Sequence, residues 1–184
     1  MLAGEIGALV REMAAWMTPG PLLCRLNAEL AATWSPDLFV SAVCLSFDPD
    51  TRRGTIALAG QMPPVIRRPG TTAVLDVAAG LPLGVLDGER YREREFDLAA
   101  DELLVAVTDG ITDPLASDVD PLGTAALARL VGGAPPDPSS ICASLLGAAE
   151  RAGLRDDATV LAVAPPLRGA MSSCVPRRTD RLAA

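Results

Sequence analysis

The sequence predicts an α+β domain in which antiparallel sheets and helices are stacked in layers. Two amphipathic helical segments open the chain, and several short strand-like segments then follow one another without helices between them. Two more helical segments precede a last strand. Strands that are joined directly by turns favour antiparallel pairing, whereas parallel neighbours need a long crossover between them.

The N-terminal helices are predicted from apolar side chains that recur at helical spacing. Residues 2–17 have this pattern, and the segment Thr18–Pro21, which contains two prolines and a glycine, is expected to end the first helix. A second helix with the same kind of spacing is expected to continue to about Thr33.

The middle of the chain is predicted to form short strands and hairpins. Residues 48–54 are rich in turn-forming residues, so the strands on either side should make a hairpin. Residues 103–107 are an uninterrupted apolar run, which is typical of a buried strand. The expected strands cover residues 39–47, 55–59, 65–67, 73–77, 91–98, 103–107 and 158–164.

Two helices are expected between the last two strands. Asp120 is expected to be the N-cap of a helix that runs to about Val131, with Pro121 in its first turn. The other helix is expected over Ser139–Ala152, because Gly153 can adopt the left-handed conformation that commonly closes a helix.

The composition excludes several kinds of catalytic site. The chain has no histidine and its 16 basic residues are all arginine, so neither a Ser-His-Asp triad nor a phosphate-binding lysine can be built. Catalysis has to rely on carboxylates, cysteine, arginine or metal. The formal net charge of -7 also argues against a nucleic-acid-binding protein, which needs a concentrated basic face.

The cysteines and the two ends of the chain bear on its location. None of the 4 cysteines forms a C-x-x-C pair, so we expect ordinary core thiols in a reducing cytoplasm. The first helical segment contains Glu5, Arg11 and Glu12, so it is neither a signal-peptide core nor a membrane span. A single domain is expected over residues 1–165, and an arginine-rich disordered tail over residues 166–184.

Two acidic turns are the candidate site for chemistry. Asp109 and Gly110 directly follow the apolar run 103–107, and Asp156 and Asp157 directly precede the last strand. If these two strands are neighbours, the carboxylates project from the same edge of a sheet and can bind Mg²⁺ or Mn²⁺, which prefer oxygen ligands. Because Asp and Gly are also common turn residues, the residues by themselves favour an ordinary turn and a helix-to-strand connection.

Six short motifs occur in a specific order along the chain. They are Leu22–Leu30, Phe39–Ala42, Ala59–Pro64, Leu81–Gly84, Val107–Asp113 and Arg155–Val160. In this order, over about residues 4–164, the chain resembles the SpoIIE/RsbU-like branch of the PPM (type 2C) metal-dependent protein phosphatases. Each motif is weak alone, whereas their common order and spacing are specific.

The resemblance implies an α-β-β-α sandwich of antiparallel sheets that hydrolyses phosphoserine or phosphothreonine on a bacterial signalling protein. An anti-anti-sigma-factor-like protein is the expected substrate. In this family two Mg²⁺ or Mn²⁺ ions activate the attacking water. The resemblance makes Asp109 and Asp157 catalytic metal ligands. Asp156 is a further ligand, or it orients Asp157 or caps the preceding turn. It places Thr108, Gly110, Asp113 and Gln61 around the metals and the substrate.

Two departures from the family pattern change what is expected of the site. Gln61 stands where the family usually has histidine, so this side chain can form hydrogen bonds but cannot titrate. The family's D-x-x-G-H-G segment, whose aspartate bridges both metals, has no counterpart before the helix that begins near Met1. The expectation is therefore an N-terminally truncated domain with a weak or single metal site.

Three explanations of this truncation remain open: a natural chain that begins further upstream, a decayed gene fragment, and a functional pseudophosphatase. The first two are favoured because the remaining metal motifs are intact. The alternative function is a catalytically inactive, phosphatase-like module that binds a partner in sigma-factor-type regulation. The apolar faces of the first two helices could also bind a regulator or form a dimer.

Overall fold

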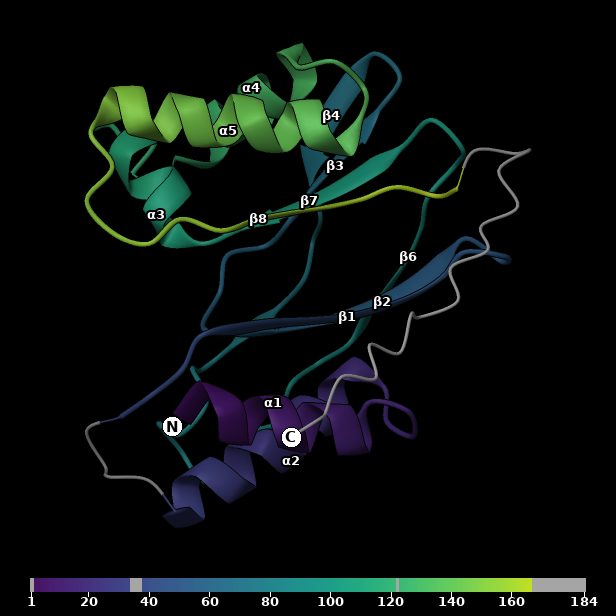
Figure 1. Cartoon of the computed structure of the whole chain (residues 1–184), viewed down its shortest axis with the longest axis vertical. Coiled ribbons are helices and arrows are strands. Elements are labelled where there is room, and N and C mark those ends of the chain that lie inside the picture. The colour runs from purple at the N-terminus through teal and green to yellow at the C-terminus, as the bar shows by residue number, and fades with distance from the viewer. Residues whose placement is uncertain (1, 34–37, 122, 167–184) are drawn as a thin grey trace, which may run out of the picture.

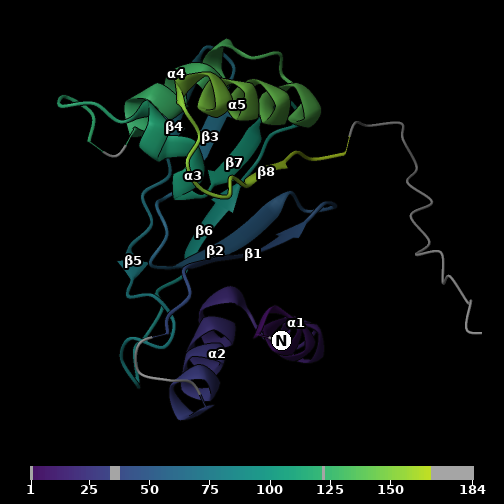
Figure 2. The same ribbon diagram turned by 60° about the vertical axis from the view of Figure 1, so that its left-hand side comes forward.

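The computed structural model describes residues 2–33, 38–121 and 123–166, which fold into stacked layers (Figure 1). A pair of N-terminal helices covers the outer face of a first sheet, a second sheet packs on the inner face, and a pair of C-terminal helices covers the second sheet. Figure 2 shows the same order of layers from another direction. The predicted α-β-β-α sandwich is confirmed. The predicted tail lies, apart from Pro166, outside the described residues.

The N-terminal helices are α1 (Leu2–Met13) and α2 (Pro19–Thr33). The first is shorter than expected, and Trp16, which follows it, is 88% exposed. The second begins two residues before Pro21, because prolines in a first turn lack only an N–H group that would have no helical partner. The N–H group of Gly20 in this first turn donates instead to the Oε1 atom of Glu93, at 2.8 Å.

The first sheet is built around the predicted hairpin of β1 (Ala42–Asp48) and β2 (Arg53–Ala59). The strand β6 (Arg94–Asp97) pairs antiparallel with β2, and the two-residue β5 (Ala79–Gly80) pairs parallel with the end of β2. This short parallel pair departs from the expected antiparallel pattern. The strand expected over residues 91–98 is shorter because only four of its residues pair in register with β2.

The second sheet has the strand order β4-β3-β7-β8, and all of its pairs are antiparallel. The strand β7 has the predicted bounds, Leu103–Val107, and all of its residues are buried. In the hairpin of β3 (Val65–Arg68) and β4 (Thr71–Val74), the strand β4 begins and ends earlier than the strand expected over residues 73–77. The last strand, β8 (Val160–Val163), is shorter than residues 158–164, because its pairing with β7 covers only these four residues.

The C-terminal half contains the short helix α3 (Asp109–Thr112), the 3-10 turn η1 (Asp113–Leu115), and the helices α4 (Thr124–Gly133) and α5 (Pro138–Ala152). The closure of α5 is confirmed, since Gly153 has a φ of 93° and its N–H group donates to the carbonyl oxygen of Glu150. The two long helices pack on the second sheet, opposite the first sheet.

The start of α4 differs from the prediction. Its N-cap is Gly123, with a φ of 62°, so the helix begins at Thr124 rather than at Pro121. Asp120 still stabilises the helix, because its Oδ2 atom accepts a hydrogen bond of 3.0 Å from the N–H group of Ala126. That N–H group lies in the first helical turn, where the backbone offers no partner.

Three clusters of apolar side chains hold the layers together. One joins α4 and α5 to the second sheet, another joins α1 and α2 to the first sheet, and a third fills the space between the sheets. Their fully buried members include Leu127, Ile141, Leu145, Leu23, Leu83, Ile56, Leu58 and Leu104. In the described part of the chain, no helix combines the length and the apolar character that crossing a bilayer requires.

Candidate active site

The two acidic turns lie side by side at one end of the second sheet, because β7 and β8 are neighbours (Figure 1). The N–H group of Thr108 donates to the carbonyl oxygen of Thr159, at 3.1 Å. The N–H group of Thr159 donates in return to the Oγ1 atom of Thr108, at 2.9 Å, across a sequence separation of 51 residues. The structure therefore meets the condition on which the predicted site depends.

Gly110 allows the closest approach between these turns. A Cβ atom added at this position would lie 2.3 Å from the carbonyl oxygen of Asp157 and 3.2 Å from the Cα atom of Ala158. Backbone atoms cannot yield as a flexible side chain can, so only glycine fits here without displacing one of the turns. The glycine of the Thr108–Gly110 motif is thus explained by packing against the second acidic turn.

The carboxylates of both turns form local hydrogen bonds and remain exposed to solvent. The Oδ1 atom of Asp109 accepts from the N–H group of Gly110, at 3.0 Å. The Oδ1 atom of Asp156 accepts from the N–H group of Asp157, at 2.7 Å. This bond fixes the N–H group of Asp157, and the role of Asp156 at a metal site stays a prediction.

A hollow of about 280 Å³ lies beside the acidic turns. It brings Asp113, which was expected near the substrate, together with Asp156 and Gly110. The same hollow is lined by Arg155, the first residue of the Arg155–Val160 motif. The other lining residues are Pro114, Ala152 and Gly153.

The side chain of Gln61 forms its hydrogen bond with Ser41 rather than with one of the candidate carboxylates. Its Nε2 atom donates to the Oγ atom of Ser41, at 2.8 Å, which ties its loop to the segment that leads into β1. The neighbouring Met62 packs against the apolar cluster that contains Val107 and Ile111, beneath the acidic turns. Met62 therefore ties this loop to the core that carries the acidic turns, and a direct contact of Gln61 with substrate remains a prediction.

The carboxylates provide an incomplete metal site. Among the residues that the structure describes, no group of three or more His, Cys, Asp or Glu side chains converges so as to hold a metal ion. Asp109 and Asp157 come from adjoining turns, but a dinuclear centre needs more carboxylate ligands than this pair supplies. The described residues therefore do not fit a complete two-metal centre.

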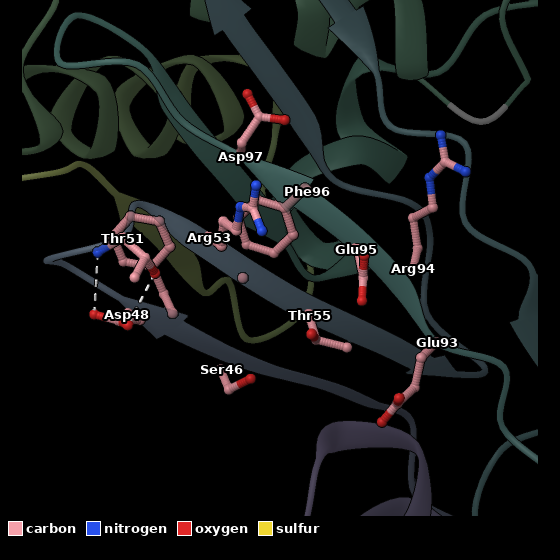
Figure 3. Close-up of a pocket in the computed structure, with 12 residues that line it drawn as sticks. Ser46, Asp48, Thr51, Arg53, Thr55, Glu93, Arg94, Glu95, Phe96 and Asp97 are labelled. Carbon is pink, nitrogen blue, oxygen red and sulfur yellow. Dashed lines mark hydrogen bonds between the residues drawn. The ribbon is translucent and has the colours of Figure 1, made fainter.

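A larger hollow, of about 870 Å³, lies on the first sheet and is not part of this site (Figure 3). Two of its carboxylates, those of Asp48 and Glu93, form hydrogen bonds that hold the local structure. The Oδ1 atom of Asp48 accepts hydrogen bonds from the N–H groups of Asp50 and Thr51, which close the β1–β2 turn. The hydrogen bond from the Thr51 hydroxyl, followed by these two backbone bonds, lowers the pKa of Asp48. Glu93 binds the first turn of α2.

The layered fold and the paired acidic turns define a PPM-type phosphatase domain of the SpoIIE/RsbU-like kind. Residues 1–166 match the family described as Stage II sporulation protein E (SpoIIE), and the chain belongs to this family. A comparison with curated proteins gave no match.

Solved structures with the same fold include those of three bacterial proteins. The phosphatase domain of SpoIIE from Bacillus subtilis, presoaked with Mn, is 18% identical with a TM-score of 0.62, over 86% of this chain and 72% of that chain. The RsbU and RsbW domains of a Mycobacterium tuberculosis protein are 23% identical with a TM-score of 0.68, over 85% of this chain and 44% of that chain. The SiaA-PP2C domain of Pseudomonas aeruginosa is 18% identical with a TM-score of 0.69, over 86% and 64% respectively.

Proposed function

We propose that this chain is a serine/threonine phosphatase domain that hydrolyses phosphoserine or phosphothreonine on a bacterial signalling protein and depends on Mg²⁺ or Mn²⁺. Asp109 and Asp157 are the proposed catalytic metal ligands. Asp156 is proposed to hold the turn of Asp157, and Asp113 to face the substrate in the adjoining hollow. The observation that carries the proposal is the contact between the two acidic turns within the fold of this family.

The local geometry supports a site at this position. The reciprocal hydrogen bonds between Thr108 and Thr159 fix the two turns, and Gly110 lets them touch. Both proposed ligands are exposed, and Mg²⁺ in proteins is commonly held by one or two carboxylates while it keeps several waters. The incomplete ligand set supports the binding of one ion with modest affinity rather than a tight pair.

Turnover of a phosphate ester tests the proposal. The chain should hydrolyse p-nitrophenyl phosphate and a phosphoserine peptide in the presence of Mn²⁺, and EDTA should abolish this activity. Asp109→Asn and Asp157→Asn should each lower kcat/KM by about 100-fold or more, because each removes a ligand charge. Asp101→Asn is the matched control, since this exposed aspartate lies beyond the opposite end of β7. Turnover that survives EDTA would refute the proposal.

An anti-anti-sigma-factor-like phosphoprotein is the proposed substrate, and the cytoplasm is the proposed location. One of the solved structures of this fold contains an RsbU domain together with an RsbW domain, which supports a role in the same kind of regulation. The measurement is mass-spectrometric loss of phosphate from a phosphorylated protein of this class. A preference for free phosphoserine over the intact phosphoprotein would argue against this substrate.

A second candidate function is supported by the incomplete ligand set. A phosphatase-like module without catalysis would bind a regulatory partner, and the absence of a three-ligand cluster among the described residues favours this reading. It predicts partner binding that is unaffected by EDTA and by Asp157→Ala. The apolar side of α1 packs largely against α2, so a dimer through these helices stays a prediction whose check is the molar mass in solution.

A further inference from the structure

The hollow beside the acidic turns contains one basic side chain among its lining residues. Arg155 lines it together with Asp113 and Asp156, and Gly110 forms the wall on the side of α3. The remaining charges of the lining are therefore negative. A phosphate group, which carries up to two negative charges, needs a positive group to enter such a place, and Arg155 is the residue positioned to supply it.

The end of α5 places Arg155 at this position. The helix stops at Ala152, and the left-handed conformation of Gly153 turns the chain toward β8. Arg155 thus stands on the short connection that leads to Asp156 and Asp157. Its place in the site is set by the same turn that positions the second acidic pair.

The guanidinium group of Arg155 is not engaged in an ion pair with the described residues. Arg25 pairs with Glu29, and Arg68 pairs with Glu102 at 3.0 Å, whereas no described carboxylate lies within 4.0 Å of Arg155. A guanidinium group keeps its charge at all working pH values and can donate two parallel hydrogen bonds to a phosphate. Arg155 therefore has its donors available for a ligand in the hollow.

We propose that Arg155 binds the phosphoryl group of the substrate, and the phosphate product, in the hollow formed with Asp113 and Asp156. This inference rests on the proposed function for the nature of the phosphorylated substrate, but phosphate binding can be measured without turnover. Arg155 is a substrate-binding residue in this account, and its contribution should appear mainly in affinity.

The experiment measures the affinity for orthophosphate by isothermal titration calorimetry in the presence of Mg²⁺. Arg155→Met should weaken binding by about tenfold or more, because it removes charge-assisted hydrogen bonds. Arg155→Lys keeps the charge but loses the paired donors, so it should lie between wild type and Arg155→Met. Arg151→Met is the matched control, because Arg151 lies one helical turn earlier, outside the lining of the hollow, and should leave the affinity unchanged.

The kinetic arm uses p-nitrophenyl phosphate under the same conditions. Arg155→Met should raise KM and the inhibition constant of phosphate by similar factors, with a smaller effect on kcat. Equal phosphate affinities for Arg155→Met and Arg151→Met would overturn the inference, and so would a wild-type chain that binds no phosphate. A wild-type chain that binds phosphate through Arg155 without turning over would uphold the inference and refute the phosphatase proposal.

Discussion

At the scale of single residues, Tyr91 shows how burial creates a pH dependence. Its side chain is 5% exposed in the cluster beneath α2, and its hydroxyl group has no hydrogen-bond partner in the described structure. Burial, followed by the nearby Glu89 and Cys24, raises the pKa of Tyr91 to about 12. The folded state thus keeps this proton to a higher pH than the unfolded state, whose tyrosine pKa is about 10.

The sign of the effect follows from proton linkage. The stability that the raised pKa of Tyr91 contributes is complete below pH of about 10 and is lost as the pH rises through about 12, because only the unfolded state releases the proton. Tyr91→Phe should therefore lose less stability than wild type in urea unfolding between these pH values. At pH 8 Tyr91→Phe should be at least as stable as wild type, since the removed hydroxyl group is buried without a hydrogen-bond partner.

The composition of the chain limits the number of other groups that contribute to this pH dependence. The chain has one tyrosine and no lysine, so few other side chains titrate in the alkaline range. Cys44 is the competing group, because burial and then Glu93 raise its pKa, and Cys44→Ala supplies a background without it. If wild type and Tyr91→Phe lose the same stability in that background, the hydroxyl group is not buried as described.

Individual site residues were only partly predictable from the sequence. Asp109 and Asp157 could be selected because each adjoins a strand-like segment within a specific motif. The hydrogen bond between Asp156 and the N–H group of Asp157 depends on backbone geometry, which the spacing of residues in the sequence does not reveal. The same is true of the hollow that Asp113 and Asp156 both line. Arg155 precedes the acidic pair in the sequence, but its role in the hollow depends on how Gly153 ends the helix.

At the scale of elements, Gly110 couples α3 to the turn that precedes β8. Gly110→Ala should destabilise the protein by about 1–3 kcal/mol, because the new methyl group would collide with the backbone of Asp157. Gly133→Ala is the control, since a Cβ atom at that exposed helix end meets nothing within 4 Å. Alanine is a better helix former than glycine, so the control should be neutral or slightly stabilised. Urea unfolding measures both, and equal midpoints would contradict the described contact.

Elements were predicted well where local sequence and packing agree. The strand β7 has its predicted bounds because every residue is apolar and buried, and α5 ends as predicted because Gly153 adopts the left-handed conformation. The predicted start of α4 was wrong, because the N-cap of this helix is Gly123 rather than Asp120. The strands β6 and β8 are shorter than predicted, because each extends only over the four residues that pair with its neighbouring strand.

At the scale of the whole molecule, the candidate site exists only because the second sheet is assembled. Asp109 and Asp157 are separated along the chain by α4 and α5, and the antiparallel pairing of β7 with β8 brings their turns together. Hydrophobic periodicity could predict the strands but not which strands are neighbours. The order of the six motifs predicted the pairing of these two strands through resemblance to the family. In the structure the pairing is direct, with Val107 opposite Val160.

This dependence on assembly predicts that a divalent ion stabilises the folded protein. An ion that binds only the folded state stabilises it by RT ln(1 + [L]/Kd), which is about 2.7 kcal/mol at a concentration of 100 times Kd. Thermal unfolding of the chain should therefore shift to higher temperature as Mn²⁺ is added, and Asp109→Asn or Asp157→Asn should each remove the shift. Asp50→Asn is the control, because this exposed aspartate lies in the turn between β1 and β2. Stabilisation that is the same in all variants would place the ion elsewhere, whereas no shift in wild type would favour the partner-binding module over the metal-dependent phosphatase.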